Sequence, residues 1–379
     1  MPLSLYIHYP FCTNLCHYCD FYKIKYLPES ESQYFDALDT EIRLAGESVS
    51  PHERLIDTIY IGGGTPSLAS TLHLKKLLRQ IRERFQIADN LEFSFEINPE
   101  SMDADRLLFL RELGVNRPIF GLQSFDRKIL KLLNRKHDLD HSAQAIYLAR
   151  AIGFDNFGID MIFGLPRQTT KRLSADLAQL LEFNPPHISY YQLTVEKGTG
   201  LEKKIENGEI NVPDSDFSAA MYQAITTELE KNGYNRYEIS SFARPGFECR
   251  HNMKYWEGGE FLGLGPSAHS FIKGQRFANI PDFKIYIDRL NHFERPLVFD
   301  VSDKKSRIYE SIMLGLRTSK GINRDIFQSQ FGIPVEQAVD IDSFRAVVDR
   351  GLVDPEGDFI KVTPAGFPLA DEIIRRLVR

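Results

Sequence analysis

Three cysteines lie close together near the start of the chain, Cys12, Cys16 and Cys19, with the spacing C-x3-C-x2-C. They follow an apolar run, residues 3–8, that is typical of a β-strand. Three thiolates can bind three irons of a [4Fe-4S] cluster, whereas a cluster that only carries electrons normally takes four cysteines. The spacing therefore predicts a [4Fe-4S] cluster in which one iron is open to a small ligand.

Two alternatives to such a cluster are a structural zinc site and three thiols that bind no metal. Structural zinc sites take four ligands, usually from two separated pairs. The chain has one further cysteine, Cys249, and it stands alone. The triplet therefore fits an iron-sulfur cluster better than it fits zinc.

Composition and charge set broad limits on the class of protein. The chain has 379 residues, of which 42% are hydrophobic and 26% charged, and this favours two globular domains or one large barrel with an appendage. A net charge of −6 gives no reason to expect nucleic acid, and Arg79, Arg82 and Arg84 recur at the spacing of a solvated helix face. No run reaches the ~18 apolar residues of a membrane span. Because thiols grouped in one loop favour a reducing compartment, we expect a cytoplasmic protein.

Strand-like and helix-like segments alternate along the first half of the chain. Apolar, β-rich runs occur at residues 3–8, 56–61, 91–97, 116–120, 156–163 and 187–193. Amphipathic stretches of helical period lie between them, for example at 32–45, 72–85 and 103–113. Such alternation predicts parallel strands that are joined by helical crossovers.

The number of these units and the polar residues at their ends indicate the fold class. Polar residues fall at or just beyond the ends of successive strands, and in a barrel those ends meet at one mouth. Six units instead of eight predict an α/β fold, an incomplete (β/α)6 barrel, over residues 1–235. We expect a connecting segment at 236–297 and a small, mainly helical C-terminal domain at 298–379, for which a turn and strand at 355–363 make a winged-helix-like unit one option.

Several residues at the strand ends have the chemistry of a ligand site. The loop 62–66, Gly-Gly-Gly-Thr-Pro, allows the backbone to approach a ligand with its N–H groups exposed. Glu96, Gln123 and Asp160 interrupt apolar strands, where a polar group without a partner is costly, so we expect them at the barrel mouth. A solvent-facing strand position is the alternative for Glu96. Arg135 follows the fourth strand and is either a clamp for a carboxylate or an ordinary surface arginine.

Together these residues resemble the radical S-adenosylmethionine (SAM) superfamily, and within it the oxygen-independent coproporphyrinogen oxidase branch. The resemblance runs from residue 3 to about 280 and continues weakly to the end. It implies that the amino and carboxylate groups of SAM chelate the open iron of the cluster. The SAM contacts that it implies are Tyr6, Tyr18, Gly63, Gly64, Thr65, Glu96, Gln123, Arg135, Asp160 and Tyr191.

Two departures point to one family within that branch. The oxidases usually have a fourth cysteine two residues after the third, together with an N-terminal extension; here that position is Phe21 and the triplet begins at residue 12. Both features resemble the shorter heme chaperone family. Residues 249–256 resemble a His-Asn-x-x-Tyr-Trp motif that is associated with heme in that family, which implies His251 as an iron ligand with Tyr255 and Trp256 beside it. A histidine that is merely hydrogen-bonded is the alternative for His251.

The resemblance implies a protein that binds a [4Fe-4S] cluster, SAM and heme and delivers heme to acceptor hemoproteins, with a homodimer as one expected state. Two other functions remain open. One is an enzyme that decarboxylates the propionates of coproporphyrinogen III through a 5′-deoxyadenosyl radical. The other is an iron-sulfur protein without SAM, but this would leave the loop 62–66 without a role.

Overall fold

The computed structural model describes residues 2–50 and 53–378 of the chain, which divide into two compact units. The first unit comprises residues 1–221 and 260–300, and the second comprises residues 222–259 and 301–379. The cysteine triplet and the strand-end residues belong to the first unit. The motif around His251 belongs to the second unit.

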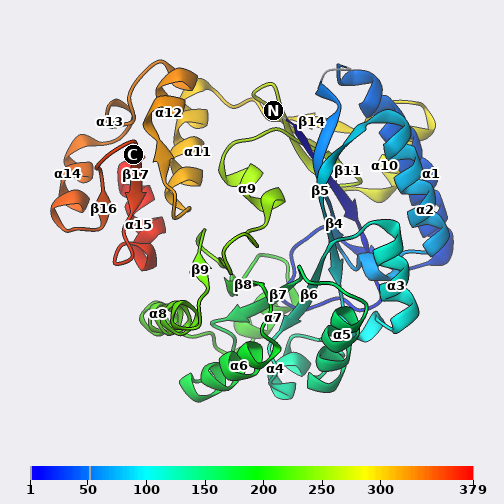
Figure 1. The fold of residues 1–379 in the computed structure, drawn as a ribbon, viewed down its shortest axis with the longest axis horizontal. Coiled ribbons are helices and arrows are strands. Elements are labelled where there is room, and N and C mark those ends of the chain that lie inside the picture. The colour runs from blue at the N-terminus through cyan, green and yellow to red at the C-terminus, as the bar shows by residue number, and fades with distance from the viewer. Residues whose placement is uncertain (1, 51–52, 379) are drawn as a thin grey trace. The chain divides into compact units, whose positions relative to one another are not determined.

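Six parallel strands form the centre of the first unit, and they lie side by side in the order in which they occur along the chain (Figure 1). They are β1 (Leu3–Tyr9), β4 (Leu55–Gly63), β5 (Gln86–Ile97), β6 (Arg117–Gln123), β7 (Gly158–Phe163) and β8 (His187–Gln192). Strands β1, β6 and β7 are buried almost throughout, as expected for parallel strands that are covered on both faces. Each strand overlaps one of the six runs that the sequence predicts.

Helices connect these strands and lie around their outside (Figure 1). They are α1 (Pro28–Ser48), α2 (Thr71–Arg84), α3 (Ala104–Leu113), the short α4 (Arg127–Leu132), α5 (Leu139–Ala151) and α6 (Thr170–Phe183). The ends of α3 follow from its sequence: the Asp103 side chain accepts a hydrogen bond from the N–H of Arg106, and Gly114 ends the helix with a φ of 105°. The predicted helix at 103–113 therefore has the observed limits to within one residue.

The sheet continues beyond β1, away from the other five parallel strands. Strand β11 (Phe261–Leu264) pairs with β1 in parallel, and β12 (His269–Ile272), β13 (Gln275–Asn279) and β14 (Leu297–Phe299) follow in antiparallel order. Within the described residues, no pairing joins this edge to β8, so the sheet is open. Six β/α units on an open sheet agree with the incomplete barrel predicted from the sequence.

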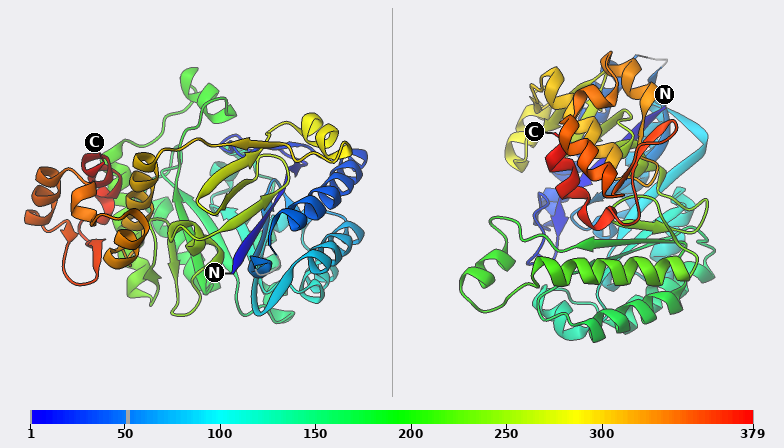
Figure 2. Two further views of the ribbon diagram at one scale, coloured as in Figure 1. Left: turned by 90° about the horizontal axis from the view of Figure 1, so that it is seen from above. Right: turned by 90° about the vertical axis from the view of Figure 1, so that its left-hand side faces the viewer.

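A buried carboxylate fastens this added edge to the first helix. Glu41 of α1 has no exposed surface and accepts hydrogen bonds from the N–H of Gly265 at 2.8 Å, the amide of Asn279 at 2.6 Å and the hydroxyl of Tyr286 at 2.7 Å. Tyr286 belongs to α10 (Phe283–Asn291), which lies beside α1 (Figure 2). Because three donors satisfy its two oxygens, this carboxylate is a structural group.

The second unit is mainly helical, with a small antiparallel sheet. Its elements are the C-terminal part of α8 (Ser215–Lys231), β9 (Asn235–Arg236), β10 (Ser241–Ala243), α9 (Arg250–Trp256), α11 (Lys304–Leu316), β15 (Ile322–Asn323), α12 (Arg324–Phe331), α13 (Val335–Ala338), α14 (Ile341–Asp349), β16 (Val353–Asp354), β17 (Phe359–Val362) and α15 (Ala370–Leu377). One apolar core that includes Ile312, Phe327 and Ile360 holds the C-terminal helices against the sheet β15-β17-β16. None of the helices described in either unit is long and apolar enough to cross a membrane.

Candidate functional site

A cavity of about 430 Å³ lies at the C-terminal ends of the parallel strands in the first unit. Most of the residues predicted as cluster or SAM ligands line it: Cys12, Cys16, Tyr18, Cys19, Gly63, Gly64, Thr65, Glu96, Gln123, Arg135, Asp160 and Tyr191. They come from all six strand ends, as the barrel geometry requires. Tyr6 and the three residues of the heme motif do not line this cavity.

The first cysteine is the most enclosed of the three thiols. Cys12 ends the short strand β2 (Phe11–Cys12) and is buried, and its Sγ atom accepts a hydrogen bond from Oγ1 of Thr65 at 3.4 Å. Burial raises the pKa of Cys12 to about 11, although the Thr65 hydroxyl opposes the rise. Burial also raises the pKa of Cys19, against the nearby charge of Lys23. Both groups therefore favour the neutral thiol until a cation stabilises the thiolate.

The three thiols do not converge on a single point. Across residues 2–50 and 53–378, no three His, Cys, Asp or Glu side chains are grouped closely enough to hold one metal ion. In an iron-sulfur cluster each cysteine binds a different iron, so its ligands need not meet at one point.

The cysteine loop is fixed to the end of α4 and to the chain that follows it. The N–H of His17 donates to the carbonyl of Leu133 at 3.1 Å, and Nδ1 of His17 donates to the carbonyl of Leu132 at 2.8 Å. The Asn134 amide donates to the carbonyl of Leu15 at 2.8 Å. The loop therefore has a defined position even though Leu15 and Phe21 are 46% and 61% exposed.

His8 holds the other side of the loop. Its Nε2 donates to the carbonyl of Tyr22 at 2.7 Å, while its Nδ1 accepts from the hydroxyl of Tyr6 at 3.0 Å; these partners assign the tautomer. Burial lowers the pKa of His8 to about 4, so the ring is neutral at physiological pH. Tyr6, which the resemblance implies as a SAM contact, thus lies behind the cavity and contacts His8.

The glycine-rich loop packs against the cysteine loop. The N–H of Gly63 donates to Glu96, that of Gly64 to the carbonyl of Tyr9 at 2.7 Å, and that of Thr65 to the carbonyl of Phe11 at 2.9 Å. A side chain at Gly64 would come within 2.7 Å of the Phe11 carbonyl. The expectation that these N–H groups are exposed to a ligand was wrong, because they bond to the protein, and at Gly64 glycine is needed for this close approach of two backbones.

Glu96 faces the cavity and is held on both of its oxygens. The Tyr60 hydroxyl donates to Oε1 at 2.9 Å and the N–H of Gly63 donates to Oε2 at 3.1 Å. Burial raises the pKa of Glu96 in spite of these two donors. The carboxylate keeps lone pairs that can accept from a ligand, since each oxygen accepts more than one hydrogen bond.

Two further acceptor oxygens in the cavity have no hydrogen-bond partner. Oε1 of Gln123 and Oδ1 of Asp160 are buried and unpaired, although Ser189 bonds to the Asp160 carboxyl. Gln123 also has a φ of 64°, which is unusual for a residue other than glycine. Burial raises the pKa of Asp160 to about 7. Unsatisfied buried oxygens are rare, so these two are suited to the donor groups of a ligand.

Arg135 joins the cysteine loop to two strand ends. Its guanidinium is half-buried and donates to Oδ1 of Asn98 at 3.1 Å, to the carbonyl of Gly121 at 2.6 Å and toward Sγ of Cys16 at 3.8 Å. Burial opposes its charge, but Tyr18 and Cys16 more than compensate and raise the pKa of Arg135. Its position in the lining of the cavity excludes the surface alternative.

The heme motif lies on α9 of the second unit. His251 has no exposed surface, and its Nε2 shares a hydrogen bond of 2.7 Å with the Tyr255 hydroxyl. Burial lowers the pKa of His251 to about 3 and keeps the ring neutral. Tyr255 and Trp256 are half-buried. In this conformation a heme iron can reach Nε2 only if the bond to Tyr255 opens.

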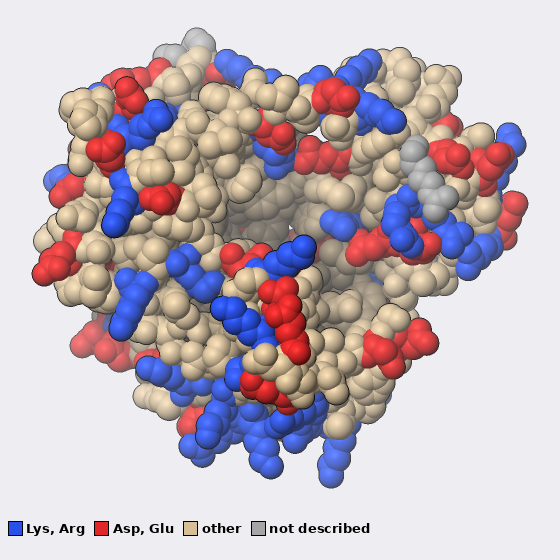
Figure 3. Space-filling view, turned by 180° about the vertical axis from the view of Figure 1, so that it is seen from behind, with Lys and Arg blue, Asp and Glu red and all other residues tan. Residues whose placement is uncertain are grey.

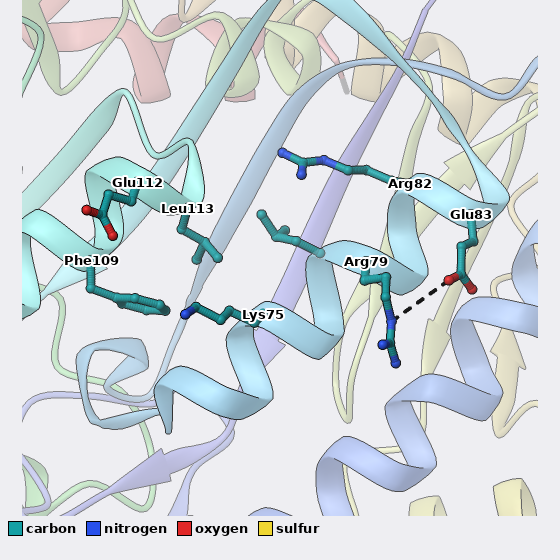
Figure 4. Close-up of a pocket in the computed structure, with 8 residues that line it drawn as sticks. Lys75, Arg79, Arg82, Glu83, Phe109, Glu112 and Leu113 are labelled. Carbon is teal, nitrogen blue, oxygen red and sulfur yellow. Dashed lines mark ion pairs between the residues drawn. The ribbon is translucent and has the colours of Figure 1, made fainter.

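A second hollow, a groove of about 400 Å³, lies between α2 and α3 (Figure 4). Its lining includes Lys75, Arg79, Arg82 and Phe109, and the Arg79 side chain pairs with Glu83 at 3.8 Å. The groove has no thiol and no unpaired buried acceptor. It contains two of the three arginines that the sequence predicts on a solvated helix face, and it is separate from the cavity.

Tyr60 and Asn98 also line the cavity, and neither is among the ligands predicted from the sequence. Tyr60 donates to Glu96, and Asn98 accepts from Arg135 and donates to Oγ1 of Thr65 at 3.4 Å. Tyr60 lies two positions before Gly62 in β4, so strand alternation places it on the same face. Asn98 follows Glu96 at the same interval, and the sequence already groups it with Glu96 among the polar residues at the strand ends.

Comparisons with known proteins place these features in a family. The model of the Radical SAM superfamily matches residues 6–180, and that of the HemN C-terminal domain matches residues 303–369. The heme chaperone HemW of Bacillus subtilis is 34% identical over 374 residues, which cover 98% of this chain and 97% of that protein. HemW of Mycobacterium tuberculosis is 33% identical over 383 residues, covering 100% of this chain and 95% of that protein. The chain belongs to the HemW family of the radical SAM superfamily.

A solved structure agrees with this HemW-family assignment at the level of the fold. The coproporphyrinogen III oxidase HemN of Escherichia coli, described as a radical SAM enzyme, superposes with a TM-score of 0.86 at 27% identity and covers 99% of this chain and 89% of that one. The radical SAM fold and the resemblance predicted from the cysteine triplet are therefore confirmed. The match also extends to the C-terminal unit of this HemW-family chain.

Proposed function

We propose that the chain is a heme chaperone that binds a [4Fe-4S] cluster, SAM and heme and transfers heme to acceptor hemoproteins. The observation that carries the proposal is the similarity to HemW proteins along essentially the whole chain. The three thiols in one cavity and the reducing environment that they require favour a cytoplasmic location.

The cavity has the donor set that a cluster and SAM need. Cys12, Cys16 and Cys19 would hold three irons, with Thr65 and Arg135 as donors toward two of the sulfurs. SAM carries an α-amino group, an adenine amino group and two ribose hydroxyls that can donate, and the unpaired oxygens of Gln123 and Asp160 are acceptors. When bound, the cluster and SAM supply one-electron chemistry, while the protein orients them and excludes water.

The heme site in the proposal depends on the motif and the family relationship. Its members His251, Tyr255 and Trp256 are together on α9, but the hydrogen bond between His251 and Tyr255 must be replaced when iron binds. Such competition suits a protein that transfers heme. Because the Tyr255 hydroxyl competes with the heme iron for His251, the heme is released more easily.

The deciding experiment combines a heme titration with an activity assay. The protein is reconstituted anaerobically, heme binding is followed by Soret absorbance, and coproporphyrinogen III is supplied with SAM and a reductant. Stoichiometric heme binding, transfer to an apo-hemoprotein and no porphyrinogen turnover would support the chaperone. Absence of heme binding and transfer would refute it.

A second function, the oxidative decarboxylation of coproporphyrinogen III, is favoured by the structural similarity to HemN. Phe21, at the position of the fourth cysteine of the oxidases, is exposed at the surface and provides no ligand. Formation of protoporphyrinogen in the same assay would establish this enzyme activity in place of the chaperone.

A further inference from the structure

A carboxylate lies in the apolar face of α6, outside the lining of the cavity. Leu173, Leu177 and Leu180 bury this face, and Asp176 among them is only 2% exposed. The exposed Lys and Arg side chains gather along the lower edge of the face in Figure 3, the end of the molecule where Figure 1 places α4 and α6. Asp176 differs from them in sign and in burial, and a buried carboxylate needs hydrogen-bond donors.

Both oxygens of Asp176 bind the loop between β6 and α4. Oδ2 accepts from the Ser124 hydroxyl at 2.9 Å, and Oδ1 accepts from the N–H of Phe125 at 2.9 Å. Burial raises the pKa of Asp176 to about 6, although these two donors oppose the rise. In mildly alkaline solution the carboxyl is therefore ionised and accepts from both groups.

The residue just before this loop, Gln123, has an unusual backbone conformation. The N–H of Ser124 donates to the carbonyl of Leu122 at 2.8 Å, which closes a γ-turn with Gln123 at its centre and a φ of 64°. The pairing of β6 with β7 also shifts its register between Gly121 and Gln123, and such bulges redirect side chains. A positive φ is strained in a residue other than glycine, and it persists only where the surrounding structure holds it.

This γ-turn determines where the Gln123 amide lies. A side chain at Gly121 would come within 2.8 Å of Nε2 of Gln123, so the amide lies over this glycine, and its Oε1 is buried in the cavity lining without a hydrogen-bond partner. On the other side of the turn, Nε2 of His137 donates to the carbonyl of Leu122 at 2.9 Å. His137 and Asp176 thus hold the residues before and after Gln123, and neither of them lines the cavity.

We propose that Asp176 is a positioning residue for SAM. By holding Ser124 and Phe125, it keeps Gln123 in the strained turn that presents Oε1 to a donor group of the ligand. When Asp176 is removed, the turn relaxes toward a less strained conformation and Oε1 loses its direction. The inference rests on the SAM site of the proposed function, whereas the role of Asp176 in holding the turn does not.

The alternative is a carboxylate that only fastens two elements, as Glu41 does at the edge of the sheet. The partners of Glu41 belong to the outer strands and α10, whereas those of Asp176 directly follow a strained residue of the cavity. A fastening role changes stability and does not act on SAM through Gln123. The two roles therefore differ in whether the effects of Asp176 and Gln123 on SAM binding are coupled.

The test is a double-mutant cycle for SAM binding by the full chain. The cluster is reconstituted anaerobically, and Gln123→Ala, Asp176→Ala and the double variant are titrated with SAM by calorimetry. We expect each single variant to lose at least about fivefold in affinity and the double variant to bind within about twofold of Gln123→Ala. Losses that multiply in the double variant, or unchanged affinity in Asp176→Ala, would overturn the proposal.

Arg172→Ala is the matched control. Arg172 joins α6 to the same loop through Asp126 at 3.0 Å, one helical turn before Asp176, so its removal loosens the loop but leaves both bonds of Asp176 in place. We expect unchanged SAM affinity, and a loss equal to that of Asp176→Ala would contradict the specific role of the carboxylate. If Asp176→Ala does not fold, Ser124→Ala is the milder variant: it removes one of the two bonds and should weaken SAM binding only when Gln123 is present.

Hydrogen exchange followed by mass spectrometry separates this inference from the proposed function. Peptides that cover residues 122–126 should exchange faster in Asp176→Ala than in the unmodified chain, because the N–H groups of Ser124 and Phe125 lose their support. Unchanged exchange in these peptides would refute the role of Asp176 in the turn. Absence of SAM binding by the unmodified chain would refute the SAM site and with it the ligand, while hydrogen exchange still decides whether Asp176 holds the turn.

Discussion

Nη1 of Arg135 lies 3.8 Å from Sγ of Cys16, while Nη2 of the same guanidinium donates to the carbonyl of Gly121 at 2.6 Å. One planar group therefore connects the cysteine loop with the end of β6. A third contact, to Asn98, adds the end of β5. These three segments are far apart in the sequence. Their relative position thus depends on the planar arrangement of the N–H donors of Arg135 and not on its charge alone.

Replacement of Arg135 by lysine should separate these effects. The ammonium keeps the charge but cannot satisfy Asn98, Gly121 and Cys16 together, so buried acceptors lose their donor. We expect the cluster content after anaerobic reconstitution to fall at least twofold and the free energy of unfolding of the cluster-free chain to fall by about 1–3 kcal/mol. Iron and sulfide analysis measures the cluster content, and urea unfolding measures the free energy of unfolding. Lys136→Ala, on the exposed neighbour, is the control, and full cluster content in Arg135→Lys would contradict the argument.

Thr65 should tune the cluster through Cys12. Its hydroxyl donates to the Cys12 sulfur at 3.4 Å, and hydrogen bonds to the sulfurs of a cluster raise its reduction potential by stabilising the reduced state. We expect Thr65→Val to lower the midpoint potential, measured by anaerobic redox titration, while Thr65→Ser keeps it near the original value. Equal potentials for the valine and serine variants would mean that the hydroxyl does not act on the cluster.

Asp160 should make the stability of the chain depend on pH. Burial raises its pKa from 3.8 to about 7, so between these values the folded chain binds more protons than the unfolded chain. Stability at this site is therefore greatest below pH 3.8 and is lost as the pH rises through about 7. Asp160→Asn removes the cost of the buried charge and should stabilise the chain by about 1–2 kcal/mol at pH 8, with no gain at pH 4.

Urea unfolding of the cluster-free chain at the two pH values measures this effect. Asp140→Asn makes the same chemical change at an exposed position of α5 and serves as the control. A gain for Asp160→Asn that is equal at both pH values would show that the effect does not come from titration of this carboxyl.

The sequence predicts the part of the site that depends on local pattern. The triplet of cysteines and the alternation of strands and helices are sufficient to place Cys12, Glu96 and Asp160 at one mouth, because parallel strands bring their C-terminal ends together. The same regularity predicts where α3 ends, since Gly114 adopts the positive φ that stops a helix.

The remainder depends on contacts between segments that are distant in the sequence. The N–H groups of Gly64 and Thr65 are bonded because the cysteine loop packs on them, and no spacing within residues 62–66 contains this information. Glu41 lies in the apolar stripe of α1 between Leu38 and Ile42, a signal of burial, but its partners are more than 220 positions away. The local sequence also does not show that residues 260–300 extend the sheet. This extension depends on the pairing of β11 with the edge strand β1, which is distant in the sequence.

His251 should be the heme ligand in spite of its burial. His251→Ala removes Nε2 and is expected to lower heme affinity at least roughly tenfold, equivalent to about 1.4 kcal/mol, and to shift the Soret band. Loss of the buried His251 ring also destabilises the unit, so Tyr255→Phe is the second variant. It keeps the His251 ring but removes the Tyr255 hydroxyl that bonds to Nε2 of His251 at 2.7 Å. If His251 binds iron, this variant should bind heme at least as tightly as the original chain. His269→Ala, at the start of β12, is the matched control, and unchanged heme affinity and spectrum in His251→Ala would exclude this histidine as the ligand.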